Sequence, residues 1–130
     1  NNISYDEARE MSCYKLINEM CPETLMKSNI IDIKKHRIFL PKMKHTFGNI
    51  INKPTNKAFL KDIFFKLAKG LNSMHNINII HADLKPDNIM IDLDKNPHII
   101  DYGMTQHLLN DNGKYLIDTK IQTLWYRLYK

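Results

Sequence analysis

The stretch from Ile79 to Gly103 constrains the fold of this chain more than any other part of its sequence. Two short apolar runs, Ile89–Ile91 and His98–Ile100, flank the turn Asp92–Pro97, and this pattern predicts a β-hairpin. Functional polar residues lie just before the first run and just after the second. Because a hairpin places the start of one strand beside the end of the other, we expect them to converge on one small volume: Asp83, Lys85, Asn88 and Asp101.

The segment 81–88, HADLKPDN, resembles the catalytic loop of Ser/Thr protein kinases, H-R-D-L-K-P-x-N. Residues 101–103, DYG, resemble the metal-binding D-F-G triplet of the same family. The triplet alone would be a worthless signal, but the loop followed by the triplet across a hairpin is hard to produce by chance. The chain is identified as a member of the eukaryotic-type protein kinase superfamily, similar to cyclin-dependent kinases.

This resemblance implies phosphoryl transfer from ATP with Mg²⁺ as cofactor, and it gives each polar side chain a role. Asp83 would accept or orient the proton of the substrate hydroxyl, and Lys85 would lie beside the transferred phosphoryl group. Asn88 and Asp101 would bind Mg²⁺, which prefers oxygen ligands, and Gly103 would supply backbone freedom after the metal ligand. Lys85 is typical of Ser/Thr kinases and speaks against tyrosine specificity.

Further residues of the nucleotide and substrate sites follow from the same resemblance. Residues 41–43 would form the hinge between two lobes, with Met43 in this adenine-binding segment, and Met90 would form the apolar floor under adenine. Residues 123–127, TLWYR, are similar to a segment of cyclin-dependent kinases in which Thr123 would hydrogen-bond Asp83 and Lys85. Tyr14, His81 and Tyr102 would stack in an internal spine that joins the lobes.

The N-terminal residues predict a helix that begins after Ser4, with Glu7 at the reciprocal capping position and apolar residues at helical spacing. Its segment 9–16 is similar to helix C of the small kinase lobe. Glu10 would then be the carboxylate that pairs with a strand lysine holding the ATP phosphates; the alternative is a solvent-facing helix glutamate.

One departure from the family concerns activation. The arginine that precedes the catalytic aspartate, and normally receives the activation-loop phosphate, is Ala82 here. Asp118 stands where relatives carry the phosphorylated threonine, and Arg9 matches an arginine that contacts that phosphate. We therefore expect an exposed Arg9–Asp118 ion pair, worth under ~1 kcal/mol, in place of a phosphate switch.

Three other elements are predicted from local pattern. The runs 30–33 and 37–40 around a basic turn indicate a hairpin, and 44–53 indicates a short helix or turn with Gly48 as a break. Residues 57–75, capped by 54–56, predict a long helix whose apolar stripe packs in the core: Phe59, Leu60, Ile63, Phe64, Leu67, Ala68, Leu71 and Met74.

The fold class expected is α+β, a partial kinase-like fold. Residues 1–43 would form the end of the small lobe and the hinge, and 44–130 the first part of the large lobe through the activation segment. The 130 residues contain no G-x-G-x-x-G loop, no V-A-I-K-like strand and no A-P-E triplet. We therefore expect a central section that is marginally stable and essentially inactive by itself.

Composition adds little about partners. The net charge of +5 fits a solvated lysine-rich surface, no basic-aromatic pattern indicates nucleic acid, and no apolar run is long enough for a membrane span. The two cysteines indicate free thiols in a reducing compartment, hence a cytoplasmic setting, with the nucleus or a virion as alternatives. Richness in Asn, Ile and Lys weakly indicates an AT-rich genome, such as that of a large DNA virus or a parasite.

Two functions therefore remain open. The first is a Ser/Thr protein kinase with a protein substrate and a possible cyclin-like partner at the N-terminal helix. The second is a catalytically inactive kinase relic that binds a partner. The presence of Asp83, Lys85, Asn88 and Asp101 together favours the first, because a decayed site would be expected to lose one of them.

Overall fold

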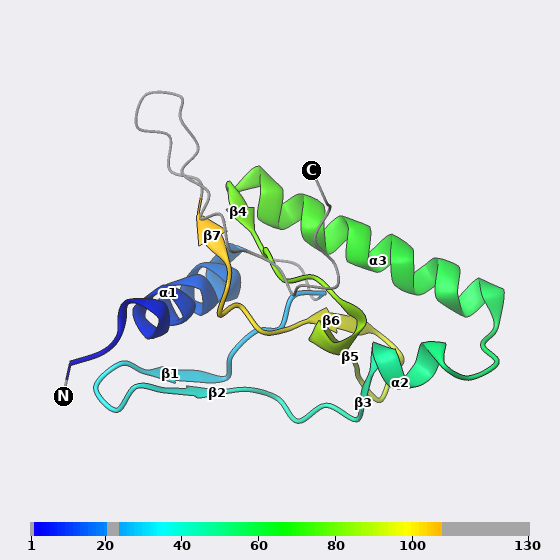
Figure 1. Cartoon of the computed structure of the whole chain (residues 1–130), viewed down its shortest axis with the longest axis horizontal. Helices are drawn as coiled ribbons and strands as arrows, with labels where there is room; N and C mark the ends of the chain where they lie inside the picture. Colours follow the sequence, from blue (N-terminus) through cyan, green and yellow to red (C-terminus); the bar gives the residue numbers. More distant parts are fainter. Residues whose placement is uncertain (1, 21–23, 108–130) are drawn as a thin grey trace, which may run out of the picture.

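The computed structural model describes residues 2–20 and 24–107, and its architecture is α+β (Figure 1). Helix α1 (Tyr5–Met20) is followed by the hairpin of β1 (Ile30–Asp32) and β2 (Arg37–Phe39). Next come β3 (His45–Thr46), α2 (Phe47–Ile51) and the long helix α3 (Lys57–Asn76). The chain continues through β4 (Ile79–Ile80), the 3₁₀ turn η1 (Pro86–Asn88), β5 (Ile89–Ile91), β6 (Pro97–Ile99) and β7 (Gln106–His107). No helix in the described ranges is both long and apolar enough to cross a membrane.

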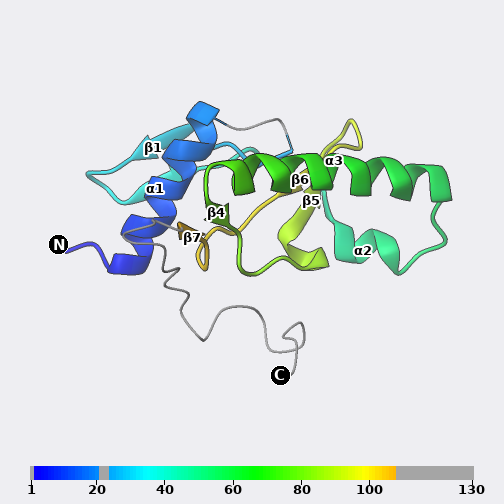
Figure 2. The same ribbon diagram turned by 90° about the horizontal axis from the view of Figure 1, so that it is seen from above.

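Helix α1 begins as its sequence predicts. The backbone N–H of Ser4 donates to the Glu7 carboxylate at 2.8 Å, and the Glu7 N–H donates to Ser4 Oγ at 3.2 Å, which completes a capping box. Its buried face carries Met11, Tyr14 and Ile17. Because this face points at the rest of the molecule, α1 packs as a core element and not as an isolated surface helix (Figure 2).

Helix α3 also forms where it was predicted, with the Asn56 side chain accepting from the Ala58 N–H at 2.7 Å. Ile63, Leu67 and Met74 are buried on the face that packs against β4 and β6. The expectation that the whole stripe is core was wrong for Phe64, which is 58% exposed, and for Ala68, which is also exposed. Its doubled apolar positions make the stripe wider than the face that the described strands cover.

Strands β3, β5 and β6 form one antiparallel sheet, and β5–β6 is the hairpin expected from the sequence. The second strand was predicted one residue too late, since β6 begins at Pro97, which pairs with Ile91. Proline is tolerated at the first position of a strand because no ladder hydrogen bond is needed from it there. Lys95, with φ of 65°, makes the tight turn between the strands.

Residues 24–26 join β6 from the other side as a short parallel bridge. The Ile99 N–H donates to the Thr24 carbonyl at 2.9 Å, and the Met26 N–H donates to the Ile99 carbonyl at 3.0 Å. Gly70 of α3 lies directly over this segment, since a Cβ there would meet Thr24 Oγ1 at 2.4 Å. The close approach of α3 therefore requires glycine at this position.

Helix α2 confirms the short helix but corrects the role of Gly48. Thr46 caps the helix, accepting from the Asn49 N–H at 3.3 Å, and Gly48 lies inside it without breaking it. A Cβ on Gly48 would lie 2.7 Å from Asp87 Oδ1, the end of an exposed side chain that can rotate away, and 3.7 Å from Pro86 Cβ, so η1 does not require glycine here.

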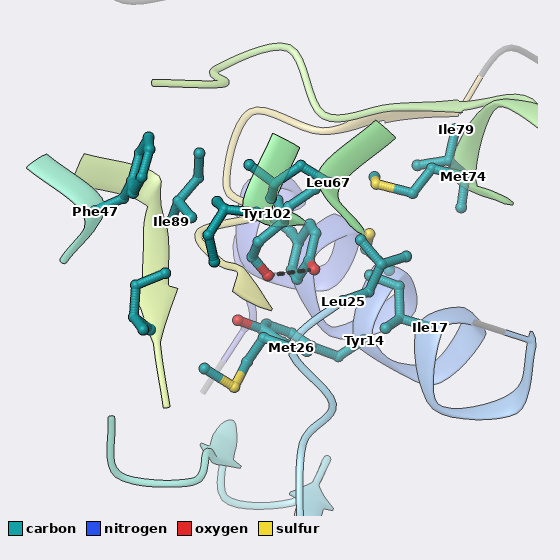
Figure 3. Close-up of a cluster of buried hydrophobic side chains, with 14 residues drawn as sticks. Tyr14, Ile17, Leu25, Met26, Phe47, Leu67, Met74, Ile79, Ile89 and Tyr102 are labelled. Atoms are coloured by element: carbon teal, nitrogen blue, oxygen red, sulfur yellow. Dashed lines mark hydrogen bonds between the residues drawn. The ribbon is translucent and has the colours of Figure 1, made fainter. Parts of the chain in front are cut away.

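A single core connects α1 to the β5–β6 hairpin (Figure 3). Side chains from α1, residues 24–26, α2, α3 and both hairpin strands meet in it, and the largest fully buried ones include Tyr14, Ile17, Leu25 and Tyr102. The hairpin that carries the polar residues is thus held by contacts from almost every element. The lobe boundary placed at residue 43 stays a prediction.

Candidate active site

His81 anchors the polar loop to the strand that precedes Asp101. Its Nε2 lies 2.7 Å from the Ile100 carbonyl, and its Nδ1 lies 3.2 Å from the Asp83 N–H. Because a carbonyl can only accept and an N–H can only donate, Nε2 carries the proton and Nδ1 is the acceptor. The ring is therefore neutral, and burial lowers its pKa below the usual value.

This arrangement predicts a stability change with pH. Below about pH 6.5 the unfolded chain binds a proton at His81 that the folded chain resists, so the free energy of unfolding should fall as the pH is lowered. Urea unfolding at pH 7.5, 6.5 and 5.5 measures the slope. His81→Gln should flatten it, and His75→Gln, at an exposed α3 position, should leave it unchanged. If the pH dependence of stability persisted in His81→Gln, another titrating group would be responsible for it.

Asp83, Lys85 and Asn88 form one compact cluster at the start of β5. Lys85 Nζ lies 3.4 Å from Asp83 Oδ2. Asn88 Nδ2 donates to the Asp83 carbonyl at 2.8 Å and to Asp83 Oδ2 at 3.1 Å. Asp83 is 7% and Asn88 5% exposed, so these charge-assisted contacts are held in a largely water-excluded place.

The amide orientation of Asn88 matters for any metal. Both acceptors facing Nδ2 are oxygens of Asp83, so the hydrogen-bond pattern assigns the nitrogen to that side. Asn88 Oδ1 therefore points away from Asp83 as a remaining acceptor. An amide oxygen presented in this way suits Mg²⁺.

The backbone of Ile100, which precedes Asp101, is hydrogen-bonded to the cluster and so places Asp101 beside it. The Ile100 N–H donates to the Asn88 carbonyl at 3.0 Å, while the Ile100 carbonyl contacts His81. Ile100 is thus fixed at both ends, and Asp101 follows it directly. The Asp101 side chain is exposed, and one of its oxygens, Oδ1, accepts from the Gly103 N–H at 3.3 Å.

The backbone of the site is bent at two non-glycine residues. Ala82 has φ of 66° and Asp101 has φ of 61°, both in the left-handed region that such residues rarely adopt. Gly103 does not have a φ in the left-handed region, and the expectation that it supplies backbone freedom after the metal ligand stays a prediction. The unusual conformation lies at the metal-ligand candidate itself, where strain is held by the surrounding structure.

Glu10 of α1 is half-buried and lies near enough to Asp101 for their charges to interact. Burial raises the pKa of Glu10, and the negative charge of Asp101 raises it further. No lysine or arginine in residues 2–20 and 24–107 forms an ion pair with Glu10. Two carboxylates near one another create a place where a cation would be stabilised.

The predicted stack of three rings is confirmed as a contact. Tyr102 is fully buried, with its ring centroid 5.0 Å from Tyr14 and 5.5 Å from His81, both edge-to-face. The Tyr102 hydroxyl donates to the Ile99 carbonyl at 2.7 Å (Figure 3). Tyr14 of α1 is therefore connected to His81 through the ring of Tyr102.

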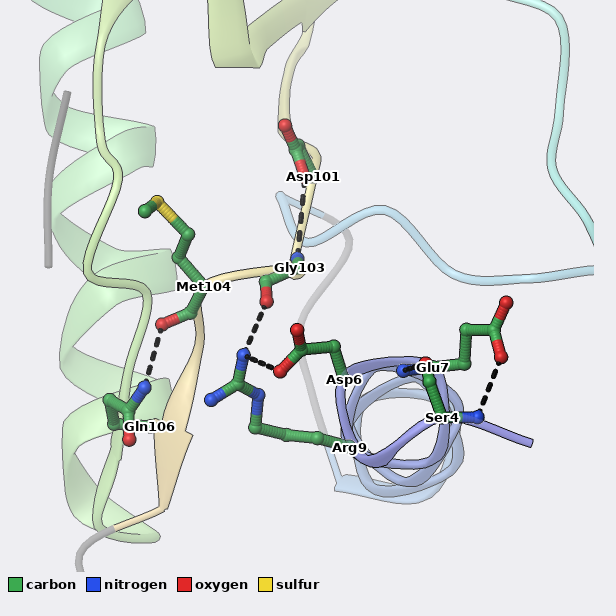
Figure 4. A network of polar contacts seen from close by, with 8 residues as sticks. All are labelled: Ser4, Asp6, Glu7, Arg9, Asp101, Gly103, Met104 and Gln106. Carbon is green, nitrogen blue, oxygen red and sulfur yellow. Dashed lines mark hydrogen bonds and ion pairs between the residues drawn. The ribbon is translucent and has the colours of Figure 1, made fainter. Parts of the chain in front are cut away.

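Arg9 makes two contacts that its sequence did not predict, and the expected pair with Asp118 stays a prediction. Its Nη2 donates to the Gly103 carbonyl at 2.8 Å and pairs with Asp6 at 3.0 Å (Figure 4). Asp118, its expected partner, lies outside the described residues, as does Thr123. The Gly103 contact was missed because 94 positions separate the two residues and no local pattern connects them.

The adenine contacts stay predictions. Met43 lines a cavity of about 850 Å³ whose other walls come from residues 24–29, α3 and the turn between β5 and β6. Met90 does not line that cavity, and neither do Asp83, Lys85, Asn88 and Asp101. The structure therefore brings Asp83, Lys85 and Asn88 into contact and places Asp101 beside them through Ile100. It does not join Met43 to them through this cavity.

The donor set fits Mg²⁺ with ATP better than a metal held by protein alone. In the part of the chain that the structure describes, no three His, Cys, Asp or Glu side chains are grouped to hold a metal ion. Mg²⁺ commonly takes only one or two protein oxygens and completes its shell with phosphate and water. Asn88 Oδ1 and the Asp101 carboxylate are such a pair.

Comparison with known proteins shows the family to which the chain belongs. The protein kinase domain model matches residues 5–128. The cyclin-dependent kinase 4 homolog of Caenorhabditis elegans is 31% identical over 83 residues, which are 64% of this chain and 20% of that protein. Homeodomain-interacting protein kinase 1 of the same species is 26% identical over 98% of this chain and 14% of its own length.

A solved structure shares the fold. The crystal structure of the yeast RNA Pol II CTD kinase CTDK-1 complex superposes with a TM-score of 0.79 over 98% of this chain and 42% of the matched chain, at 22% identity. The chain belongs to the eukaryotic-type protein kinase family, and its fold is a partial kinase fold. It spans 14–20% of the length of the two curated relatives above.

Proposed function

We propose that this chain is the phosphoryl-transfer section of a Ser/Thr protein kinase. The observation that supports it is the hydrogen-bonded cluster of Asp83, Lys85 and Asn88, fixed beside Asp101 through Ile100. Phosphoryl transfer depends mainly on positioning and on electrostatic stabilisation, and this cluster offers both.

Each polar side chain of the site would have its own role in the transfer. Asp83 would orient the substrate hydroxyl and take its proton, while Lys85, 3.4 Å away, would keep positive charge beside the transferred group. Asn88 Oδ1 and Asp101 would supply oxygen ligands, and Glu10 would hold the lysine that grips the phosphates. Mg²⁺ and ATP, when bound, would supply the phosphoryl group and neutralise its developing charge. Thr123 would hydrogen-bond Asp83 and Lys85, and Met43 and Met90 would contact adenine.

Ser/Thr specificity is supported by Lys85 and by relatives named as serine/threonine-protein kinases, from Dictyostelium discoideum and Arabidopsis thaliana. A cyclin-like partner at α1 is supported by the cyclin-dependent kinase 4 homolog among the relatives. The cysteine usage supports a cytoplasmic setting, and the Asn-, Ile- and Lys-rich composition supports an AT-rich genome such as that of a large DNA virus.

The test is phosphate transfer by the full natural polypeptide that contains these residues. With γ-labelled ATP and Mg²⁺, we expect label on serine- and threonine-containing peptides but not on the matched tyrosine peptides. Asp83→Asn should lower transfer at least about 10²-fold, because the group that orients the nucleophile is lost. Equal labelling of tyrosine peptides would contradict the specificity, and unchanged transfer by Asp83→Asn would contradict the site.

A non-catalytic, partner-binding function is the second candidate. This candidate predicts Mg²⁺-dependent nucleotide binding, or none, with no transfer to any peptide under the same conditions. The labelling experiment therefore separates the two functions.

A further inference from the structure

Arg9 connects helix α1 to the segment that carries Asp101 (Figure 4). One nitrogen, Nη2, donates both to the Gly103 carbonyl and to Asp6. The guanidinium lies 5.7 Å from the centre of the Tyr5 ring, and the side chain is 23% exposed. The contact with Gly103 is thus a charge-assisted hydrogen bond in a partly buried place.

Both ends of Gly103 are fixed around the bent backbone of Asp101. The Gly103 N–H donates to Asp101 Oδ1, and the Gly103 carbonyl accepts from Arg9. Asp101 has the left-handed φ of 61°, a conformation that persists only when surrounding contacts enforce it. Arg9 is one of those contacts, and it comes from a different element.

Glu10 is the next residue of the same helix. A helix is rigid over neighbouring residues, so fixing Arg9 on Gly103 also fixes the rotation of α1 about its axis. That rotation sets the distance between the Glu10 carboxylate and Asp101, whose charges are near enough to interact. One arginine therefore sets the relative placement of two acidic groups.

We propose that Arg9 is a positioning residue that holds the Asp101-Tyr102-Gly103 segment against α1 through its hydrogen bond to the Gly103 carbonyl. The positioning role itself does not depend on the proposed function. Only its consequence, the alignment of a magnesium–nucleotide site, rests on that function. The Arg9–Asp6 pair is secondary, because Asp6 is 78% exposed and exposed pairs contribute little.

The test compares two variants in the full natural polypeptide. Arg9→Met keeps an apolar stem of similar length but removes every donor. Asp6→Asn is the matched control, since it removes the ion pair with the same guanidinium but leaves the Gly103 contact. Hydrogen exchange is read at the N–H groups of Gly103 and Thr105, and at Ile99 as reference, whose N–H bonds Thr24.

In Arg9→Met, exchange at Gly103 and Thr105 should accelerate about tenfold, the size expected for losing one hydrogen bond from a charged donor. Ile99 should stay unchanged, and Asp6→Asn should change Gly103 and Thr105 less than about twofold. Unchanged exchange in Arg9→Met, or equal acceleration at Ile99, would overturn the proposal, the latter because it would show a general loss of stability.

Binding of Mg·ATP to the same variants gives a second readout. Arg9→Met should weaken it about tenfold and Asp6→Asn less than about twofold, since only the first releases the Asp101 segment. If Arg9→Met and wild type bound Mg·ATP with equal affinity, Arg9 would not contribute to the alignment of the nucleotide site. Absence of nucleotide binding in wild type would contradict the proposed function, while the exchange result would still decide the role of Arg9.

Discussion

Asp101→Asn is expected to remove the Mg²⁺-dependent part of nucleotide binding and to lower phosphate transfer by about 10²-fold or more. The loss is of the size seen when one electrostatic contact to a transferred group is removed. The substitution keeps the shape of the side chain and one oxygen, so the backbone bend at φ of 61° should persist, since asparagine also tolerates it. The measurement is nucleotide affinity by calorimetry, with Mg²⁺ and with chelator, in the full natural polypeptide.

The effect of Asp101→Asn on nucleotide affinity should have opposite signs without and with Mg²⁺. Without Mg²⁺, Asp101 repels the anionic phosphates, so Asp101→Asn should bind nucleotide as well as wild type or better. With Mg²⁺ the order should reverse. Asp62→Asn is the control, because it removes the same charge from an exposed position on α3 that lines neither the polar cluster nor the cavity beside Met43. Equal metal-dependent binding by wild type and Asp101→Asn would remove Asp101 from the site.

Tyr102→Ala should have the largest effect on stability, about 3–5 kcal/mol in the free energy of unfolding. The ring is fully buried between Tyr14 and His81, and truncation of a buried aromatic leaves a cavity that its neighbours cannot fill. Tyr102→Phe should cost only about 1 kcal/mol, the net contribution of one hydrogen bond. The Ile99 carbonyl would still accept from the Met26 N–H in that variant.

Urea unfolding followed by far-ultraviolet circular dichroism measures both changes. Leu93→Ala, at a side chain that is 81% exposed, should stay within about 0.5 kcal/mol of wild type. If Tyr102→Phe proved as harmful as Tyr102→Ala, the hydroxyl would be more important than the ring packing. If neither variant were destabilised, the stack would not hold the core together.

Local sequence signals were sufficient to predict the elements that have strong caps and clear periodicity. The Ser4–Glu7 capping box, the Asn56 cap of α3 and the β5–β6 hairpin are all encoded within a few residues. The cluster of Asp83, Lys85 and Asn88 could be predicted for the same reason, since a hairpin start places them together.

Features that depend on distant partners could not be predicted. Residues 24–26 pair with β6, and Arg9 reaches Gly103, although neither contact leaves a local pattern in the sequence. The left-handed conformations of Ala82 and Asp101 could not be foreseen because neither residue is glycine. The expectation that Gly48 breaks the short helix was wrong, because it lies inside α2. The exposure of Phe64 depends on which neighbours cover α3, which helical periodicity alone does not specify.

The bridge between residues 24–26 and Ile99 has a mechanical consequence for α1. Residues 24–26, which follow this 16-residue helix, are hydrogen-bonded to β6. We therefore expect any tilt of the helix to be smallest at its C-terminal end and largest toward its N-terminus. Glu10 lies about 15 Å from Met20 along the axis, so each 10° of tilt would carry its carboxylate about 2.6 Å. Because a displacement of about 1 Å can change a transfer rate about 10²-fold, a swing of about 4° is enough to separate an aligned site from a misaligned one.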